Sequence, residues 1–172
     1  MSVAANTHDL TSVEAFYKRW GPDVFVFCRL FLGDKEQAEK VSANVFVDYC
    51  RESSELPVSG DIPGRLVNRA YRAMPPCRGT QPAQRKCDRL EDCIPHLDCN
   101  ERVVFILRNV LGMDWEATSR ATELSAEQVR QFWLTGMLRM RELLRVGFFR
   151  SATDVRRLHQ NELLLICQNI DV

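Results

Sequence analysis

The stretch GMDWEATSRATELSAEQVRQFWLTGMLRMRELLR, residues 112–145, decides the fold because it contains two helix starts separated by a tight turn. Asp114 stands where the N-cap of a first, short helix is expected. Ser125 and Gln128 then form the Ser-x-x-Gln pattern of a capping box, which predicts the start of a longer helix. This order is that of a helix-turn-helix, whose second helix can lie in the major groove of DNA.

The second helix of this motif is expected to have one buried face and one solvent face. Apolar residues recur at helical spacing and predict a buried stripe: Val129, Trp133, Gly136, Met137, Met140, Leu143 and Leu144. The opposite face carries Glu127, Arg130, Gln131, Arg139, Arg141 and Arg145. Arg and Gln side chains can form paired hydrogen bonds with guanine and adenine edges, so this face is a candidate DNA-binding surface.

Upstream, the sequence predicts a bundle of four helices. Residues 24–32 are almost continuously apolar, which predicts a helix buried nearly all round, although the Val and Phe content leaves a strand as the competing interpretation. Gly21-Pro22 is expected to end the helix before it, and Gly33-Asp34 to end this one. Further helices are expected over 35–52 and from Asp61 to about Met74.

Three prolines and a glycine within residues 75–82 cannot continue a helix, so they mark a domain boundary. The extreme C-terminus predicts one extra helix, either packed on the preceding domain or used for a dimer or partner contact. The expected organisation is all-α: a helical domain over 10–74, a linker over 75–88, a helix-turn-helix domain over 89–146 and a C-terminal extension over 147–172.

Composition narrows the class of protein. The 172 residues contain no apolar run of membrane-spanning length and begin without a signal-peptide pattern, so we expect a cytoplasmic chain with no membrane insertion. The net charge is zero, yet residues 62–87 hold six basic residues and no acid, whereas residues 34–61 are rich in acids. A basic stripe can follow phosphates while an acidic helix faces a protein partner.

The seven cysteines do not predict a disulfide framework, because their number is odd and the expected compartment is reducing. Four residues cluster as candidate zinc ligands: Cys87, Cys93, His96 and Cys99. Their spacing is not the paired short-gap pattern of structural zinc sites, so we expect thiols and no metal, with a thiol or zinc sensor kept as an alternative. The histidines show no catalytic arrangement and there is no Gly-rich phosphate loop, so neither an enzyme nor a cofactor is expected.

A family resemblance covers most of the chain. The C-terminal half resembles the promoter-reading domain of bacterial sigma factors of the extracytoplasmic-function type in the segments IPHL (94–97), RVVFIL (102–107), GMDWE (112–116), LSAEQV (124–129) and MLRMRELL (137–144). The N-terminal half resembles the polymerase-binding domain of that family in FYKRW (16–20), VF (24–25), FLGDKEQAE (31–39) and VF (45–46). The resemblance implies a sigma region 2-like bundle, a region 4-like helix-turn-helix and promoter-specific transcription initiation.

The same resemblance implies three sets of contact residues and three partners. The polymerase-binding set is Glu39, Asn44, Phe46 and Asp48. The promoter-melting set is Arg65, Arg69, Tyr71 and Arg72, in which an exposed tyrosine can stack on an unpaired base. The recognition-helix set is Glu127, Gln128, Arg130, Gln131 and Leu134. The implied partners are core RNA polymerase, promoter DNA and an anti-sigma factor.

Some positions depart from the family pattern. Lys40, Ala43 and Asn44 stand where the family usually carries aspartate and a Gln-Glu pair, and Glu123 stands at the usual turn glycine. Gln128 also has a purely structural role open to it, as the capping-box partner. The alternative to a sigma factor is therefore a sigma-like DNA-binding regulator, or a protein-interaction module, that has lost full engagement of polymerase or promoter.

Overall fold

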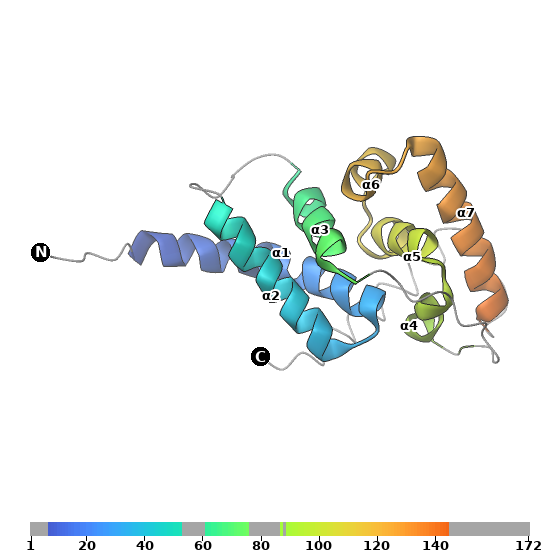
Figure 1. Cartoon of the computed structure of the whole chain (residues 1–172), viewed down its shortest axis with the longest axis horizontal. Coiled ribbons are helices and arrows are strands. Elements are labelled where there is room, and N and C mark those ends of the chain that lie inside the picture. The colour runs from blue at the N-terminus through green and yellow to red at the C-terminus, as the bar shows by residue number, and fades with distance from the viewer. Residues whose placement is uncertain (1–6, 53–60, 76–86, 88, 145–172) are drawn as a thin grey trace, which may run out of the picture. The chain divides into compact units, whose positions relative to one another are not determined.

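The structure, a computed structural model, describes residues 7–52, 61–75, 87 and 89–144. Within these residues the chain is helical (Figure 1), and the only other regular feature is an isolated bridge between Cys87 and Leu144. The prediction of an all-α chain is thus confirmed for the described part, and the strand interpretation of residues 24–32 is wrong. The chain divides into two compact units, residues 1–75 and 76–172.

Several predicted segments lie largely outside the described residues. They are most of the linker over 75–88 and the C-terminal extension over 147–172. Within the described part, no helix combines the length and the apolar character that a membrane crossing requires.

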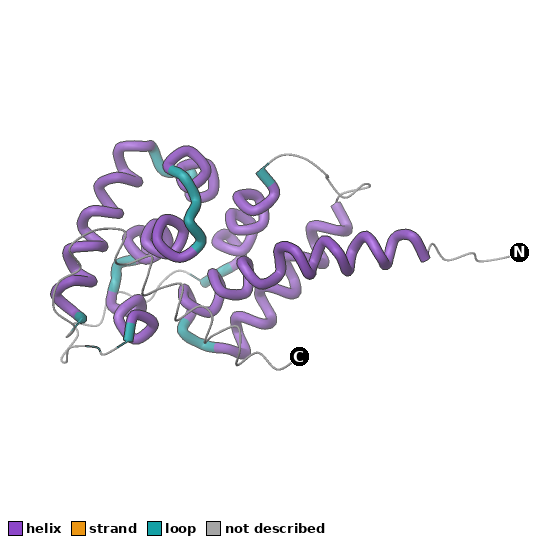
Figure 2. Tube along the Cα trace, turned by 180° about the vertical axis from the view of Figure 1, so that it is seen from behind, coloured by secondary structure: helices purple, strands orange, loops and turns teal. Residues whose placement is uncertain are grey.

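The first unit consists of α1 (Thr7–Leu32), α2 (Lys35–Glu52) and α3 (Ile62–Ala73). α1 ends at Gly33, which has a φ of 74° and donates its N–H to the Arg29 carbonyl at 3.0 Å. The Asp34 carboxylate then accepts a hydrogen bond from the Gln37 N–H at 2.8 Å and starts α2. The predicted stop and restart at Gly33-Asp34 is confirmed, and the connecting turn is short (Figure 2).

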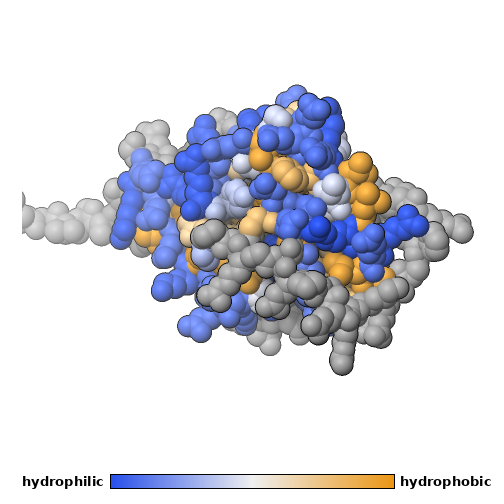
Figure 3. All heavy atoms as spheres, turned by 45° about the vertical axis from the view of Figure 1, so that its right-hand side comes forward, coloured by the Kyte–Doolittle hydropathy of each residue, from blue (hydrophilic) through white to orange (hydrophobic). Residues whose placement is uncertain are grey.

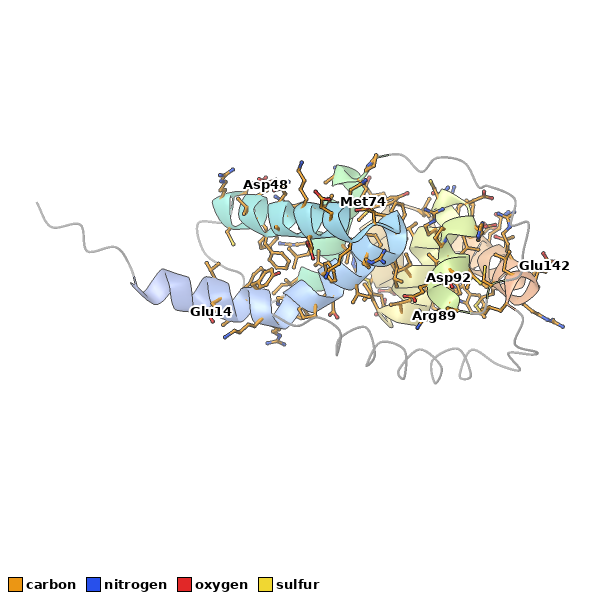
Figure 4. All side chains as sticks on the ribbon, turned by 90° about the horizontal axis from the view of Figure 1, so that it is seen from below. Glu14, Asp48, Met74, Arg89, Asp92 and Glu142 are labelled. Carbon is orange, nitrogen blue, oxygen red and sulfur yellow. The ribbon has the colours of Figure 1, made fainter. Side chains whose placement is uncertain are left out.

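The predicted helix end at Gly21-Pro22 is wrong, because α1 runs through both residues. A proline inside a helix lacks the N–H that would bond to the carbonyl four residues back, and it commonly bends the helix. The ribbon of α1 does bend within its length (Figure 4). Buried Phe16 and Val24, on either side of the proline, offset the missing hydrogen bond by packing into the core.

Aromatic rings fill the core of the first unit. Phe16 of α1 stacks on Tyr49 of α2 with ring centroids 5.5 Å apart. Phe31 of α1 meets Tyr71 of α3 edge to face at 5.6 Å. Leu66 of α3 is completely buried. These contacts attach both α2 and α3 to α1, and so fix which side of α3 faces solvent.

α3 starts where the sequence predicts it, with Asp61 as its N-cap. The Asp61 carboxylate accepts a hydrogen bond from the Gly64 N–H at 3.0 Å. A Cβ added at Gly64 would lie 2.6 Å from that carboxylate, so a side chain there would displace the cap. Pro63 occupies the first turn, where its missing N–H has no helical partner to lose.

The second unit contains α4 (Leu90–Cys93), a 3₁₀ turn (Ile94–His96), α5 (Cys99–Phe105), a π-helical turn (Ile106–Val110), α6 (Trp115–Thr122) and α7 (Ala126–Leu143). α5 starts with a capping box, in which the Glu101 carboxylate accepts from the Asp98 N–H at 3.2 Å. Phe105, Ile106 and Leu107 are buried and form the centre of this unit. α5 packs mainly against α7.

The described cysteines divide into one bridged residue and four free thiols. Cys99 is disulfide-bonded, so the expectation of a thiol is wrong at this position. Cys28, Cys87 and Cys93 are buried free thiols, and burial raises the pKa of Cys28 to about 12. Among the described residues, no three His, Cys, Asp or Glu side chains gather as a metal site.

Candidate nucleic-acid interface

Two capped helices joined by a tight turn, α6 and α7, form where the sequence predicts them. The Asp114 carboxylate caps α6 by accepting from the Ala117 N–H at 2.7 Å. After α6, Glu123 adopts a left-handed backbone conformation with a φ of 61°, which explains why glycine is the more usual residue at such a turn. The Ser119 hydroxyl donates to the Leu124 carbonyl and closes the turn from the α6 side.

The first turn of α7 is a complete capping box. The Ser125 hydroxyl accepts from the Gln128 N–H at 3.2 Å, and the Gln128 side-chain oxygen accepts from the Ser125 N–H at 2.9 Å. Val129, in the next turn, is completely buried, whereas Gln128 itself is exposed. Because its side-chain oxygen is engaged by the backbone, Gln128 holds the start of α7.

The predicted recognition residues of α7 share one solvent-exposed face. Glu127, Arg130 and Gln131 are exposed, and Leu134 is 54% exposed. Leu138, one turn further on, is 51% exposed and extends the face with a second apolar side chain. Figure 3 shows apolar residues beside polar ones on the face of the molecule drawn there. The arrangement offers hydrogen-bonding groups and apolar contacts to a DNA groove.

Arg139 does not belong to this face, although its place in the sequence predicted that it would. Its guanidinium donates to the Asp98 carboxylate at 2.9 Å and to the Glu101 carboxylate at 3.0 Å. The hydrogen bond with Asp98 raises the pKa of Arg139. Because the Glu101 side chain is only 7% exposed, Arg139 neutralises an almost buried carboxylate and fastens α7 to the start of α5.

An aromatic and polar cluster, which sequence reasoning missed, braces α6 against α7. The Trp115 and Trp133 rings meet edge to face with centroids 5.6 Å apart. The Arg108 guanidinium lies 3.9 Å from the Trp115 ring centroid, and the Trp133 indole N–H donates to Asn109 at 3.4 Å. Asn109 is a polar residue within an apolar run, which was the available signal, but the π-helical turn that aims it had no signature.

Only part of the promoter-melting set on α3 is exposed to solvent. No acidic residue occurs in α3, and Arg65, Arg69 and Arg72 lie four and three residues apart, so they share one side of the helix. Arg65 and Arg72 are exposed. Arg69 is held by Glu52 of α2, with nitrogen and oxygen 2.6 Å apart.

The prediction of an exposed Tyr71 is wrong. Its ring is half-buried and meets the Phe31 ring edge to face, and burial raises the pKa of its hydroxyl. A ring in this position is only partly accessible, so it is not the exposed stacking surface that the sequence predicted.

The polymerase-binding set on α2 also contains both exposed and buried residues. Glu39, Asn44 and Asp48 are exposed, and Asp48 lies on the side of α2 away from α1 (Figure 4). Phe46 is only 6% exposed, because its ring packs edge to face against Tyr17 with centroids 4.9 Å apart. It therefore supports the helix from inside, and the apolar side chain actually presented beside Asp48 is Val47, which is 47% exposed.

Comparison with known proteins adds no relative: no family model matches this chain, and no curated protein matches it. A functional assignment therefore depends on the residues and geometry of the two candidate surfaces, on α3 and on α7.

Proposed function

We propose that this protein is a sigma factor of the extracytoplasmic-function type, which binds core RNA polymerase and directs initiation at a subset of promoters. The observation that carries the proposal is the pair of capped helices α6 and α7 joined by a tight turn, of which the second exposes Glu127, Arg130 and Gln131 on one face. Residues near the start of a recognition helix are those that reach base edges.

The first unit supports the same proposal through its charges. α3 contributes a basic side free of acids, suited to phosphates, and α2 presents Glu39, Asn44 and Asp48 to a protein partner. In this proposal the first unit is the region 2-like domain and the second is the region 4-like domain. Core RNA polymerase and promoter DNA are the partners, in the cytoplasm, with an anti-sigma factor as the regulator.

The test is reconstitution with core RNA polymerase. The purified chain is mixed with core enzyme and a pool of genomic fragments from its source, and transcript start sites are mapped. Discrete start sites that require the chain support a sigma factor and show that Lys40, Ala43 and Asn44 are compatible with polymerase binding. Absence of core binding at low salt, where charge contacts are strongest, contradicts the proposal.

The second candidate is a DNA-binding regulator that has lost polymerase engagement. It is favoured by the burial of Phe46, which removes the one aromatic side chain assigned to the polymerase contact. Retained duplex binding without core polymerase binding would select this candidate. Loss of both would leave a protein-interaction module on the same fold.

A further inference from the structure

Arg65, Arg69 and Arg72 form an arginine stripe on one side of α3, and the central one, Arg69, has a charged partner on another helix. Arg69 pairs with Glu52 at the end of α2 at 2.6 Å, and its guanidinium carbon lies 5.5 Å from the centroid of the Tyr49 ring. Tyr49 is buried, so the ring is a fixed support under the guanidinium. The two contacts hold Arg69 at the junction of α2 and α3.

We propose that Glu52 is an intramolecular competitor for nucleic-acid phosphate, which holds Arg69 until a phosphate group displaces it. The inference rests on the proposed function only in assuming that α3 contacts nucleic acid. Glu52 is then a positioning residue. It does not touch the nucleic acid, and it determines whether Arg69 is available to bind a phosphate.

The chemistry of the pair fits an exchange of anions. A guanidinium binds carboxylate and phosphate with the same donor geometry, so one anion can replace the other on Arg69. The Glu52 side chain is 66% exposed and that of Arg69 is 31% exposed, so a phosphate has access to the pair. Exposed ion pairs are weak and screened by salt, so this one can be displaced.

The ionisation of the pair is consistent with this role. The hydrogen bond from Arg69 lowers the pKa of Glu52, and the same bond raises the pKa of Arg69. Both groups therefore stay charged near neutral pH, and the competition is present under ordinary conditions.

The test measures the affinity for a fluorescein-labelled oligodeoxythymidylate by anisotropy over a range of salt concentrations. Glu52→Gln removes the competitor and is expected to tighten binding by about two- to fivefold, the range that loss of an exposed ion pair allows. The matched control is Glu39→Gln, which removes one negative charge from the same helix. Glu39 pairs with Lys35 of the same helix at 3.8 Å.

Arg69→Ala provides the decisive comparison. The tightening caused by Glu52→Gln must disappear when Arg69 is alanine. The slope of log affinity against log salt should fall on Arg69→Ala by about 0.7 in the Glu52→Gln background, as expected for one single-strand phosphate contact, and by less in the native background. Equal effects of Glu52→Gln and Glu39→Gln would overturn the inference, as would a tightening that survives Arg69→Ala.

Failure of the inference and failure of the proposed function give different results. If Arg65→Ala weakens binding while Glu52→Gln behaves like Glu39→Gln, α3 binds nucleic acid and Glu52 has no competing role. If Arg65→Ala, Arg69→Ala and Arg72→Ala all leave binding unchanged, α3 does not contact nucleic acid, which overturns the inference and also the role that the proposed function gives to α3. Unfolding midpoints of the variants establish that each is folded before its affinity is compared.

Discussion

The two candidate nucleic-acid helices, α3 and α7, carry similar sequence patterns but present them differently. On α7 every residue of the recognition set is exposed, from Glu127 to Leu134. On α3 the melting set includes Arg69, which is paired with a neighbouring helix, and Tyr71, which is half-buried. The difference arises because α2 supplies Glu52 as the partner of Arg69, and α1 supplies Phe31, whose ring packs against Tyr71.

This comparison shows what helical spacing alone can establish. Spacing correctly placed the recognition residues on one face of α7, but it also placed Arg139 there, which instead pairs with Asp98 and Glu101. It gives no information about an acidic side chain on another helix, such as Glu52, or about a ring such as Phe31 that receives Tyr71. Whether a side chain is exposed to solvent depends on how the helices of the unit pack together.

The largest expected effect tests how much the packing of α3 contributes to the free energy of unfolding. Leu66→Ala, at a completely buried position of α3, should cost about 2–5 kcal/mol of unfolding free energy, through lost burial and the cavity left behind. The matched control is Leu138→Ala on α7, where the side chain is 51% exposed and the cost should stay within about 0.5 kcal/mol. Urea denaturation of the two variants measures both values. Similar costs would mean that the solvent face of α7 is covered in solution.

The next effect concerns how each helix contacts DNA. Arg130→Ala should reduce discrimination between binding sites by about 1–3 kcal/mol, the contribution of a bidentate arginine at a base edge. Arg69→Ala should weaken binding to all sequences alike, because a phosphate contact carries no sequence information. Competition binding with a randomised duplex pool separates these outcomes. Equal, sequence-independent effects of the two changes would remove the recognition role from α7.

The sequence was sufficient for most of the local structure. The caps at Asp61, Asp114 and Ser125 are predictable because each depends on a side chain and a backbone N–H three residues apart. The continuous α1 was not predictable, because the cost of Pro22 is offset by core contacts distant in the sequence. The site followed the same rule, since exposure of Arg130 was predicted and the pairing of Arg139 was not.

A smaller effect tests the attachment of α7. Arg139→Ala should cost about 1–2 kcal/mol, because it leaves the nearly buried Glu101 carboxylate without its charged partner, with a reduction for the 39% exposure of the Arg139 side chain. Arg130→Ala is the control, since it removes the same side chain from the exposed face of the same helix. Urea denaturation should show a loss for Arg139→Ala alone. Equal losses would indicate that the contacts with Asp98 and Glu101 add no net stability.

The smallest effect separates capping from recognition on α7. Ser125→Ala should cost about 1 kcal/mol of unfolding free energy, because the Gln128 N–H loses its acceptor. Gln128→Ala should lower stability by less, and it should change DNA affinity equally for all sequences. Gln131→Ala, one turn away and exposed, should instead alter sequence preference. If Gln128→Ala shifts the preferred sequence in the same pool, the Gln128 amide group must reach a base while its oxygen remains bound to the Ser125 N–H, and α7 would read DNA from its first turn onward.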